Sequence, residues 1–418
     1  MDADIIVIGA GLAGLQCARR AERHGHSVIV LEAGDAVGGR VQTDRIDGFL
    51  CDKGFQLLNP AYPSVRKWID TSSLELQKFG FGVVVRDGEA TSTLAHPVLH
   101  PAYALETLRS KQTQPRDLLA MARWLGPSLL RPSRVYGSAR DTTLSTSFDA
   151  AGLAGRLRSD VLDTFLAGVL ADSSGEVSAD YARLLMRFFV LSAPGLPRAG
   201  MQALPQQMAD SLSAPVRFGV AGRDLQETSD GVRVTTDSGT LSASSVVVAV
   251  GSENVADLTP LTVPVTRGLT TWWFRAPELP RRGPFLMLDA SRPGGGPAGP
   301  IWHTAVVSEA APSYAPTGHH LIEATTLLDQ PDGLATEGDI RRDLERLYST
   351  STKDWDVLAH HVVQHALPLQ PPPLRDRHPL WTGPRVLVTG DHRGTGSIDG
   401  ALLAGDRAGE AVSERLAS

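Results

Sequence analysis

The sequence predicts an α/β fold with two lobes, and three observations lead to this prediction. A chain of 418 residues, 42% of them hydrophobic, is longer than one hydrophobic core usually organises. Its N-terminal segment, up to Glu32, alternates strand, glycine-rich turn, helix and strand, which is the pattern of a βαβ unit. Apolar strands at Val246–Val250 and Arg385–Thr389 then indicate that the chain returns twice to the first sheet.

The βαβ unit carries a glycine motif that is typical of dinucleotide binding. We expect a strand at Ile5–Ile8, a turn at Gly9–Gly14, a helix from Leu15 to about His24 and a strand at Ser27–Leu31. The turn fits the pattern GxGxxG, whose glycines permit a tight turn and bring backbone close to a pyrophosphate at the helix N-terminus. Glu32 follows the second strand, where its carboxylate can accept from ribose hydroxyls and would repel a 2′-phosphate. The unit therefore predicts a Rossmann-like site that disfavours NADP.

The rest of the chain predicts a second, mixed lobe. Helical patterns dominate from 60 to 204, for example at Pro115–Leu130 and Ala154–Leu170, whereas strands of period two return from 216 to 250. A strand-rich stretch from 266 to 367 contains one helix near Asp339–Tyr348. We expect a discontinuous dinucleotide-binding domain of residues 1–59, 205–255 and 383–418, and a substrate-binding domain of residues 60–204 and 256–382 with a mixed sheet and helices.

Two further segments resemble those of a known group of flavoproteins. Gly34–Thr43, which contains Gly38-Gly39-Arg40, resembles the segment after the acidic residue in the amine oxidase, phytoene desaturase and protoporphyrinogen oxidase superfamily. Gly390–Gly405 resembles the C-terminal flavin motif of the same superfamily, and weaker matches in order extend the resemblance over nearly the whole chain. The resemblance implies a two-lobed flavoprotein with a Rossmann-like, glutathione reductase-like FAD-binding domain.

The resemblance also implies which residues contact the FAD. The Gly38–Arg40 segment brings backbone and a charged donor to the pyrophosphate, and Gly54–Gln56 brings backbone up to the isoalloxazine ring. Asp391 accepts from the ribityl or pyrophosphate region, and the Ile398 backbone N–H meets the flavin C2 carbonyl at a helix start. The predicted cofactor-binding residues are Gly9, Ala10, Gly11, Leu12, Ala13, Gly14, Glu32, Ala33, Gly38, Gly39, Arg40, Gly54, Phe55, Gln56, Gly222, Gly390, Asp391, Ser397 and Ile398. No catalytic residue is predicted.

The cysteines and histidines predict non-covalent FAD and no metal. Cys17 lies in the first predicted helix and Cys51 precedes the flavin-facing turn, whereas covalently flavinylated relatives place their cysteine in the C-terminal motif. Neither cysteine belongs to a CxxC or Cys/His cluster. His319–His320 and His360–His361 have no carboxylate or cysteine at ligand spacing, so we expect no metal site.

The reaction is not settled by the superfamily, whose members oxidise amines, desaturate polyenes, dehydrogenate porphyrinogens and isomerise double bonds. Amine oxidases of this type carry a lysine where this chain has Val265–Trp273, and an aromatic residue where it has Ser397. We therefore expect desaturase-like hydride transfer from a C–C bond of a hydrophobic substrate to flavin N5, with dioxygen or a quinone as electron acceptor. An amine oxidase with an atypical site and a non-catalytic FAD-binding protein remain the alternatives.

Charge and hydropathy restrict the partners and the location. A net charge of -6 offers no basic surface for nucleic acid, so none is expected as a partner. The N-terminus has no basic region or cleavage site, and no apolar run reaches membrane-spanning length. We expect a cytoplasmic protein, and peripheral membrane association is left open.

Several apolar residues admit two interpretations. The helical stretch Leu94–Leu130, which contains Trp124, Leu125, Leu129 and Leu130, could line a substrate tunnel and touch a membrane, although an ordinary amphipathic core helix is favoured. Trp272, Trp273, Trp302 and His303 are either pocket walls or core residues.

Overall fold

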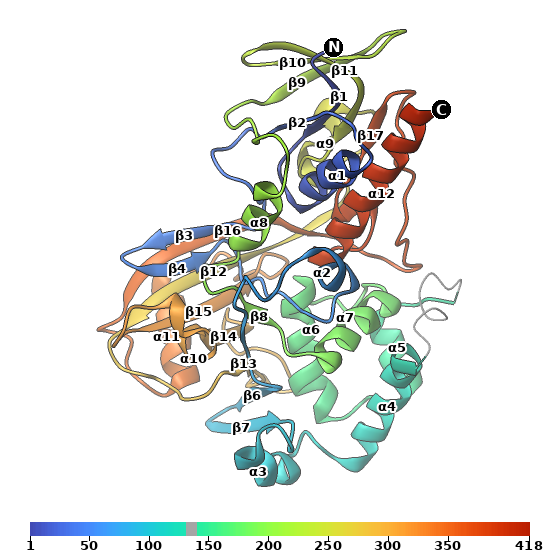
Figure 1. Cartoon of the computed structure of the whole chain (residues 1–418). Coiled ribbons are helices and arrows are strands. Elements are labelled where there is room, and N and C mark those ends of the chain that lie inside the picture. Colours follow the sequence, from blue (N-terminus) through green and yellow to red (C-terminus); the bar gives the residue numbers. More distant parts are fainter. Residues whose placement is uncertain (131–139) are drawn as a thin grey trace.

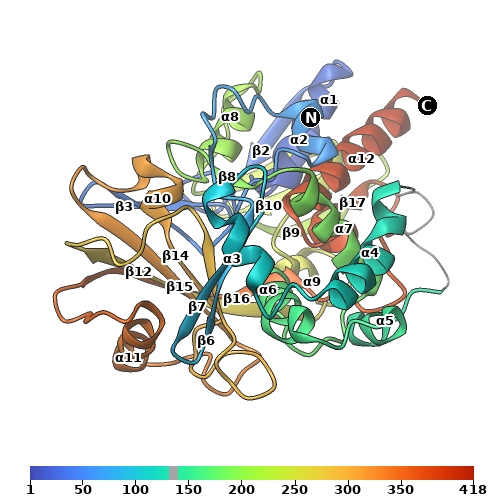
Figure 2. The ribbon, with the colours of Figure 1, turned by 90° about the horizontal axis from the view of Figure 1, so that it is seen from below.

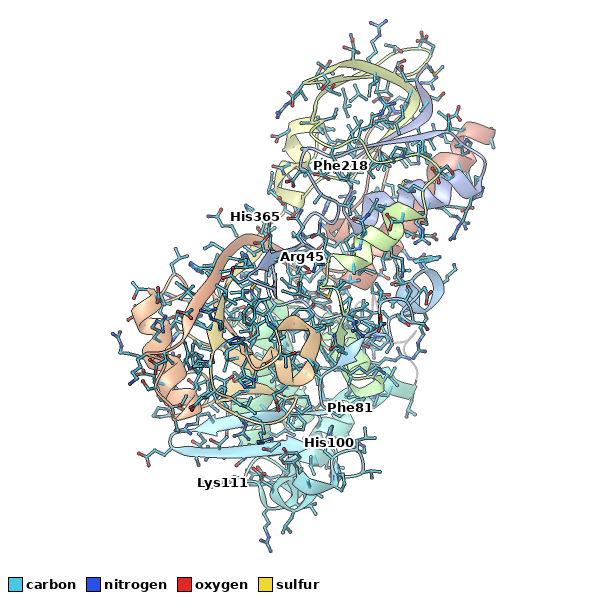
Figure 3. All side chains as sticks on the ribbon, turned by 60° about the vertical axis from the view of Figure 1, so that its left-hand side comes forward. Arg45, Phe81, His100, Lys111, Phe218 and His365 are labelled. Carbon is cyan, nitrogen blue, oxygen red and sulfur yellow. The ribbon has the colours of Figure 1, made fainter. Side chains whose placement is uncertain are left out.

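The computed structural model describes residues 1–130 and 140–418, and it has two lobes (Figure 1). Each lobe is built around its own sheet, the first of six strands and the second of seven. Figure 3 shows Phe218 in the first lobe, His100 far away in the second, and Arg45 near the junction. The predicted α/β class is confirmed, while the numerical boundaries of the two domains stay a prediction.

The first lobe contains the predicted βαβ unit. Its sheet has the order β2 (Val28–Leu31), β1 (Ala3–Ile8), β11 (Gly239–Val248), β10 (Val232–Thr236) and β9 (Gly222–Glu227), with β17 (Val386–Val388) beside β11. β1 lies parallel to β2 and β11, and β11 lies parallel to β17, so strands far apart in the sequence form its centre. Both predicted returns of the chain to this sheet are confirmed.

The first helix begins earlier than the sequence predicted. α1 spans Leu12–Arg23, whereas the expected start was Leu15. Gly11 is its N-cap, and the Leu15 N–H donates to the Gly11 carbonyl at 2.9 Å. The residues of the glycine motif therefore form the first helical turn themselves.

The second lobe is built on a sheet with the order β16 (Asp356–Pro368), β12 (Thr266–Ala276), β15 (His320–Leu327), β14 (His303–Val306), β13 (Leu286–Asp289), β6 (Gly82–Asp87) and β7 (Ala90–Ala95). One face packs on α11 (Glu337–Tyr348), whose Ile340 and Leu344 meet Phe274 and Ile322. The other face, called the inward face below, lies towards α6 (Asp163–Leu170) and the first lobe (Figure 2).

The remaining helices are α2 (Pro63–Trp68), α3 (Ala104–Arg109), α4 (Pro115–Leu130), α5 (Leu144–Ala151), α7 (Ala179–Leu191), α8 (Ala203–Asp210), α9 (Val255–Leu258), α10 (Val307–Ala310) and α12 (Ile398–Ala417). Two short strand pairs, β3 (Thr43–Ile46) with β4 (Phe49–Asp52) and β5 (Gln77–Lys78) with β8 (Gly195–Leu196), lie near the junction. The predicted helix Ala154–Leu170 is instead a π-helical turn, Leu157–Leu162, followed by α6.

The predicted helical stretch Leu94–Leu130 is partly wrong, because Leu94 belongs to strand β7. In α4 the Trp124 ring packs 4.9 Å from the Phe148 ring, and its Nε1 donates to Ser147 Oγ at 2.9 Å. Trp124 and Leu125 are buried in an apolar cluster that also contains Phe148. The amphipathic core-helix interpretation of α4 is therefore confirmed for these two residues.

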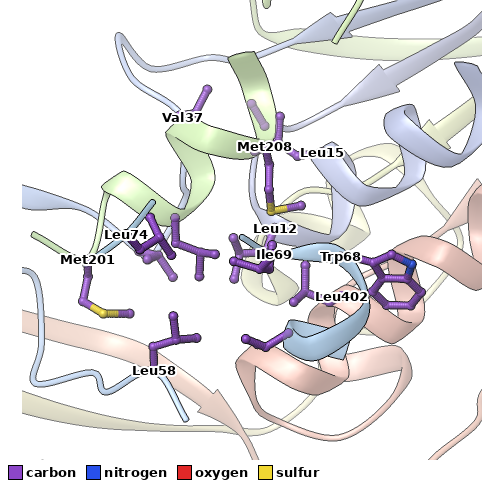
Figure 4. Packing of buried hydrophobic residues seen from close by; sticks show 14 of the residues in the cluster. Leu12, Leu15, Val37, Leu58, Trp68, Ile69, Leu74, Met201, Met208 and Leu402 are labelled. Atoms are coloured by element: carbon purple, nitrogen blue, oxygen red, sulfur yellow. The ribbon is translucent and has the colours of Figure 1, made fainter. Parts of the chain in front are cut away.

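A shared apolar cluster joins the two lobes. Figure 4 shows Leu12 of α1, Leu402 of α12, Met208 of α8 and Trp68 of α2 around this cluster, which also includes Leu58. Burying apolar surface from both lobes in one cluster opposes their separation. The glycine motif and the C-terminal helix are thereby held against the same core.

The contact between α1 and α12 depends on two glycines of α12. A Cβ on Gly405 would overlap the Ala13 carbonyl oxygen, and a Cβ on Gly409 would lie 2.6 Å from Arg20 Cβ. A hydrogen bond also joins the two helices, since Gln16 Nε2 of α1 donates to Asp406 Oδ1 of α12 at 3.1 Å. The two helices can approach this closely only because these positions have no side chain.

We predict that Gly405→Ala destabilises the protein by about 1–3 kcal/mol, because its new methyl group forces α12 away from α1. The matched control is Gly338→Ala in α11, which is exposed and has 3.8 Å of clearance to Thr336 Oγ1. This control should stabilise the protein by up to about 1 kcal/mol through helix propensity. Thermal unfolding of both variants measures the difference, and equal melting temperatures would contradict the proposed close contact.

Candidate functional site

The turn between β1 and α1 has two packed glycines and one open glycine. Gly9 has φ +107°, and a Cβ on it would lie 2.5 Å from the Ala249 carbonyl oxygen. A Cβ on Gly14 would overlap the Gly9 carbonyl, so both glycines are needed for packing. A Cβ on Gly11, in contrast, would meet no atom within 4 Å. The backbone at Gly11 is thus open to a ligand at the N-terminus of α1, as a bound pyrophosphate requires.

The acidic residue after β2 is held by backbone donors. Glu32 Oε2 accepts from the Ala10 N–H and Oε1 accepts from the Gly34 N–H, each at 2.8 Å. Ala33 is exposed beside it. These bonds fix the Glu32 carboxylate next to the glycine turn.

The second glycine segment reaches the same turn. The Gly38 N–H donates to the Ala10 carbonyl at 2.9 Å. Gly39 has φ +60°, and a Cβ on it would lie 3.6 Å from Gly11 Cα. The structure therefore brings together the two segments that the sequence assigned to the pyrophosphate, and their glycines leave room for it.

Arg40 forms an ion pair with a residue of the C-terminal motif. Its Nη2 lies 2.6 Å from Asp391 Oδ1, and its Nη1 donates to the Ala366 carbonyl at 2.6 Å. Burial by itself would lower the pKa of Arg40, but the Asp391 carboxylate raises it above its usual value. Gln56 Nε2 donates to the Arg40 carbonyl at 3.0 Å. The N-terminal and C-terminal motifs thus meet at one place.

The start of α12 is fixed by contacts with two other helices. Ser397 caps the helix, since its Oγ accepts from the Gly400 N–H at 3.0 Å, and Ile398 is the first helical residue. The Tyr181 hydroxyl of α7 donates to the Gly396 carbonyl at 2.5 Å. Asp399 is buried and accepts from the Ser64 N–H and Oγ of α2, at 3.0 and 2.5 Å. Burial raises the pKa of Asp399, and the Ser64 hydrogen bonds oppose this shift.

The segment after β4 crosses onto the inward face of the second sheet. Gly54 has φ +83°, and a Cβ there would lie 3.7 Å from Val363 Cγ2 and 3.8 Å from Leu269 Cδ1. The Phe55 ring lies 6.5 Å from the Trp273 ring and 5.7 Å from the His303 ring. The predicted flavin-facing residues therefore face the second lobe.

A buried carboxylate that the sequence analysis missed positions this segment. Asp52 accepts from Thr43 Oγ1 at 2.5 Å, the Met201 N–H at 3.0 Å and the Tyr314 hydroxyl at 2.9 Å. Its own carbonyl accepts from Trp273 Nε1 at 3.1 Å. Burial raises the pKa of Asp52 to about 6, although the three hydrogen bonds oppose this shift. Asp52 therefore links β4 to both lobes directly before Gly54.

The segment that hydrogen-bonds to the backbone of Glu32 lies just before Gly222 in the chain. Gly222 begins β9, where a Cβ would lie 3.0 Å from Ile8 Cδ1. The Glu32 N–H donates to the Arg217 carbonyl, and the Val220 N–H donates to the Glu32 carbonyl, each at 2.9 Å. Val220 is thus hydrogen-bonded to the end of β2 and Gly222 follows two residues later, so the proposed cofactor contact of Gly222 stays a prediction.

Polar side chains lie on the inward face of the second sheet, and the sequence analysis named only His303 among them as a possible pocket wall. Thr271, Thr325 and His303 lie opposite one another on β12, β15 and β14, and Glu323 lies beside them opposite Trp273. Burial lowers the pKa of His303 to about 4 and raises that of Glu323 well above its usual value, although a Thr325 hydrogen bond opposes the latter shift. The signal for Glu323 was present, because it is the single acidic residue in the otherwise buried strand β15.

The candidate pocket walls separate onto two faces of the sheet. Trp273 and His303 lie on the inward face near Phe55. Trp272 lies on the opposite face, where its ring stacks 3.8 Å from the His360 ring. Trp302 belongs to a small apolar cluster with Ala171 and Leu327.

Across residues 1–130 and 140–418, no group of three or more His, Cys, Asp or Glu side chains is arranged to hold a metal ion. No helix in the same ranges is long and apolar enough to cross a membrane. Cys17 and Cys51 are buried free thiols, and burial raises the pKa of each to about 12. A separate cavity of about 380 Å³ near β3 and β4 shares no lining residue with the predicted cofactor set.

Comparison with known proteins agrees with this geometry. The family model described as flavin containing amine oxidoreductase matches residues 12–413. AofH of Mycobacterium tuberculosis, which is assigned as a flavin-containing monoamine oxidase, is 27% identical over 268 residues, covering 59% of this chain and 56% of AofH. The chain thus spans about half the length of the curated relatives it matches.

Solved structures share the fold over the full chain. An oxidoreductase of Methanosarcina mazei superposes with a TM-score of 0.73 at 17% identity, covering 96% of this chain and 98% of the other. A putrescine oxidase with bound putrescine superposes with a TM-score of 0.71 at 17% identity, covering 100% of both chains. The superfamily resemblance is confirmed, because the family model spans nearly the whole chain: the protein belongs to the flavin-containing amine oxidoreductase family.

Proposed function

We propose that the protein is an oxidoreductase that uses non-covalently bound FAD. The main support is that hydrogen bonds connect the Gly11 turn, Arg40 and Gln56 after the Gly54–Phe55 segment, while an ion pair joins Arg40 to Asp391 from the opposite end of the chain. Glycine turns and a helix N-terminus suit a pyrophosphate, and Glu32 suits a ribose. The buried thiols of Cys17 and Cys51 lie outside the C-terminal motif, which supports non-covalent binding.

The roles of the residues follow from their places in the chain. FAD, when bound, supplies the redox chemistry by accepting a hydride equivalent from the substrate. Glu32 would accept from the ribose, Gly11 and Gly39 would leave room for the pyrophosphate, and the capped N-terminus of α12 at Ile398 would stabilise negative charge on the flavin. The second sheet would then hold the substrate against Phe55.

We propose a hydrophobic substrate from which hydride leaves a C–C bond, with dioxygen or a quinone as the final acceptor. At the centre of β12 the inward residues are Leu269, Thr271 and Trp273, and β12 contains no lysine. Apolar side chains such as Leu327 and Val363 continue the same face. Such a surface favours a substrate that gains binding energy by burial.

Amine oxidation is the second candidate, and the comparisons favour it specifically. The named relatives include a monoamine oxidase and a putrescine oxidase. Against it stand Ser397 in place of an aromatic residue and the absence of a lysine from β12.

Membrane contact stays a prediction. The exposed apolar residues of this region are Val98, Leu99, Leu105, Leu108, Leu118, Leu119 and Leu130, which lie in or near α3 and α4. Exposed apolar side chains of this kind suit a membrane surface or a protein partner.

The purified protein should be yellow, and heat or acid precipitation should release the flavin into the supernatant as intact FAD. Chromatography against FAD and FMN standards identifies the released compound. Flavin that remains with the precipitated polypeptide, or that proves to be FMN, would contradict the cofactor proposal.

Gly11→Ala should abolish FAD retention without unfolding the protein. The new Cβ meets no protein atom, and Gly11 has φ -73°, which alanine adopts freely, but the methyl group occupies the ligand side of the turn. We expect FAD affinity to fall at least about tenfold, which corresponds to about 1.4 kcal/mol. Flavin content and circular dichroism of the apoprotein measure the two effects separately. Gly126→Ala in α4, whose Cβ also meets no atom within 4 Å, is the matched control and should keep its flavin.

An apolar polyene panel should reduce the bound flavin, whereas primary amines and diamines should not. The inward face provides apolar contact area for the polyenes. Strand β12 contains no Asp or Glu that could bind the positive charge of an amine. Anaerobic mixing, followed by bleaching of the oxidised flavin absorbance, measures the reaction. Dithionite serves as the positive control for reducibility in every sample. Rapid bleaching by an amine, with none by any polyene, would establish the second candidate instead.

A further inference from the structure

The inward face of the second sheet carries a polar row that crosses four strands. In register, His361 of β16 lies opposite Thr271 of β12, Thr271 lies opposite Thr325 of β15, and Thr325 lies opposite His303 of β14. Glu323 lies in the next row of the same face. The polar row below means these five residues. Because they share one face of a sheet, their side chains point to the same side.

Four of the five residues in the polar row have a buried side-chain atom without a hydrogen-bond partner, although Glu323 Oε1 accepts from Thr325 Oγ1 and His361 Nε2 lies 2.9 Å from Asp44 Oδ2. Thr271 Oγ1, His303 Nε2, Glu323 Oε2 and His361 Nδ1 are buried and have no hydrogen-bond partner among the described residues. Thr271 and Glu323 are 0% exposed, and His303 is 6% exposed. Buried polar atoms are nearly always hydrogen-bonded, so several unpaired atoms on one face indicate that a bound molecule completes them.

Packing fixes the position of His303 close to Glu323. The Phe55 ring lies 5.7 Å from the His303 ring, and a Cβ on Gly168 of α6 would overlap Nδ1 of the same ring. His303 Nε2 lies 3.7 Å from Glu323 Oε1, which is too long for a direct hydrogen bond. One oxygen atom placed between these two side chains could hydrogen-bond to both.

The polar row is built for an uncharged partner. Over residues 1–130 and 140–418, no Lys or Arg forms an ion pair with Glu323. Burial raises the pKa of Glu323 and lowers that of His303 to about 4, so burial favours the uncharged form of both side chains. A protonated carboxyl and a neutral imidazole each offer one donor and at least one acceptor. This combination complements a hydroxyl or a carbonyl better than it complements an ammonium group.

We propose that the polar row binds a neutral hydroxyl or carbonyl group of an otherwise apolar substrate and thereby orients that substrate beside Phe55. This inference rests on the proposed function, since it places the substrate on the inward face. The apolar part of the substrate would contact Leu269, Trp273 and Val363 on the same face. The row acts by binding and orienting, and it takes no part in the redox step.

Two adjacent threonines provide a matched test. Thr271 lies on the inward face with an unpaired hydroxyl, whereas the Thr270 hydroxyl lies 2.7 Å from Thr326 Oγ1 on the opposite face. The holoenzyme and its Thr271→Val and Thr270→Val variants are titrated anaerobically with benzyl alcohol, toluene and benzylamine. Perturbation of the visible flavin absorbance reports binding, and thermal unfolding reports stability.

Benzyl alcohol should bind the native holoenzyme about tenfold more tightly than toluene or benzylamine. Thr271→Val should lose most of this preference without loss of thermal stability, because it removes an unpaired buried hydroxyl. Thr270→Val should keep the preference and lose stability. A structural role for Thr271 would move the melting temperature and leave the preference intact.

Glu323→Gln distinguishes a neutral site from a cationic one. The glutamine keeps the shape and the hydrogen-bonding capacity of a neutral carboxyl, so benzyl alcohol binding should stay within about threefold of the native value. The proposal is wrong if benzylamine binds most tightly and Glu323→Gln removes that binding. It is also wrong if benzyl alcohol binds no more tightly than toluene, or if neither compound binds. Failure of the proposed function is a separate result, since the purified protein would then contain no flavin.

Discussion

The ion pair between Arg40 and Asp391 is the contact on which the proposed cofactor site depends. Its members come from opposite ends of the chain, and Asp391 is buried, so its carboxylate would be costly to leave without a cationic partner. Arg40 also donates to the Ala366 carbonyl in β16, the long outer strand of the second sheet. One guanidinium therefore fixes the glycine segment of the first lobe relative to the C-terminal motif and to the second lobe.

The buried Asp52 network performs the corresponding role at the proposed substrate side. Its carboxylate gathers donors from the β3–β4 hairpin, from Met201 and from Tyr314, which are distant in sequence. The next residues, up to Phe55, then have little freedom, because the backbone before them is held and Gly54 lies against β12 and β16. The segment from Asp52 to Gln56 thus connects the proposed cofactor site to the proposed substrate site, and its contacts restrict its backbone.

Local patterns in the sequence predicted the parts of this protein that depend on local physics. The GxGxxG turn, the acidic end of β2 and the apolar strands β11 and β17 follow from spacing and hydrophobicity, and all lie in one sheet. The start of α1 was placed too late, because the glycines of the motif were taken as turn although they form the first helical turn. The polar row could not be found, since strands that are distant in sequence bring its residues together only through sheet register.

The register of β12, β15 and β14 also bears on why membership of the family alone does not identify the substrate. Proteins that share a fold can act on different substrates, and in our proposal the inward positions of the second sheet set the charge that meets the substrate. In this chain the inward positions combine a buried carboxyl with a buried imidazole, and no described arginine or lysine balances them. Burial favours the uncharged form of Glu323, so an ammonium ion on this face would meet a carboxyl that is costly to ionise, whereas a hydroxyl would need no change of charge. The cost of placing charge on the inward face therefore supports the neutral substrate that we propose, even though the named relatives include amine oxidases.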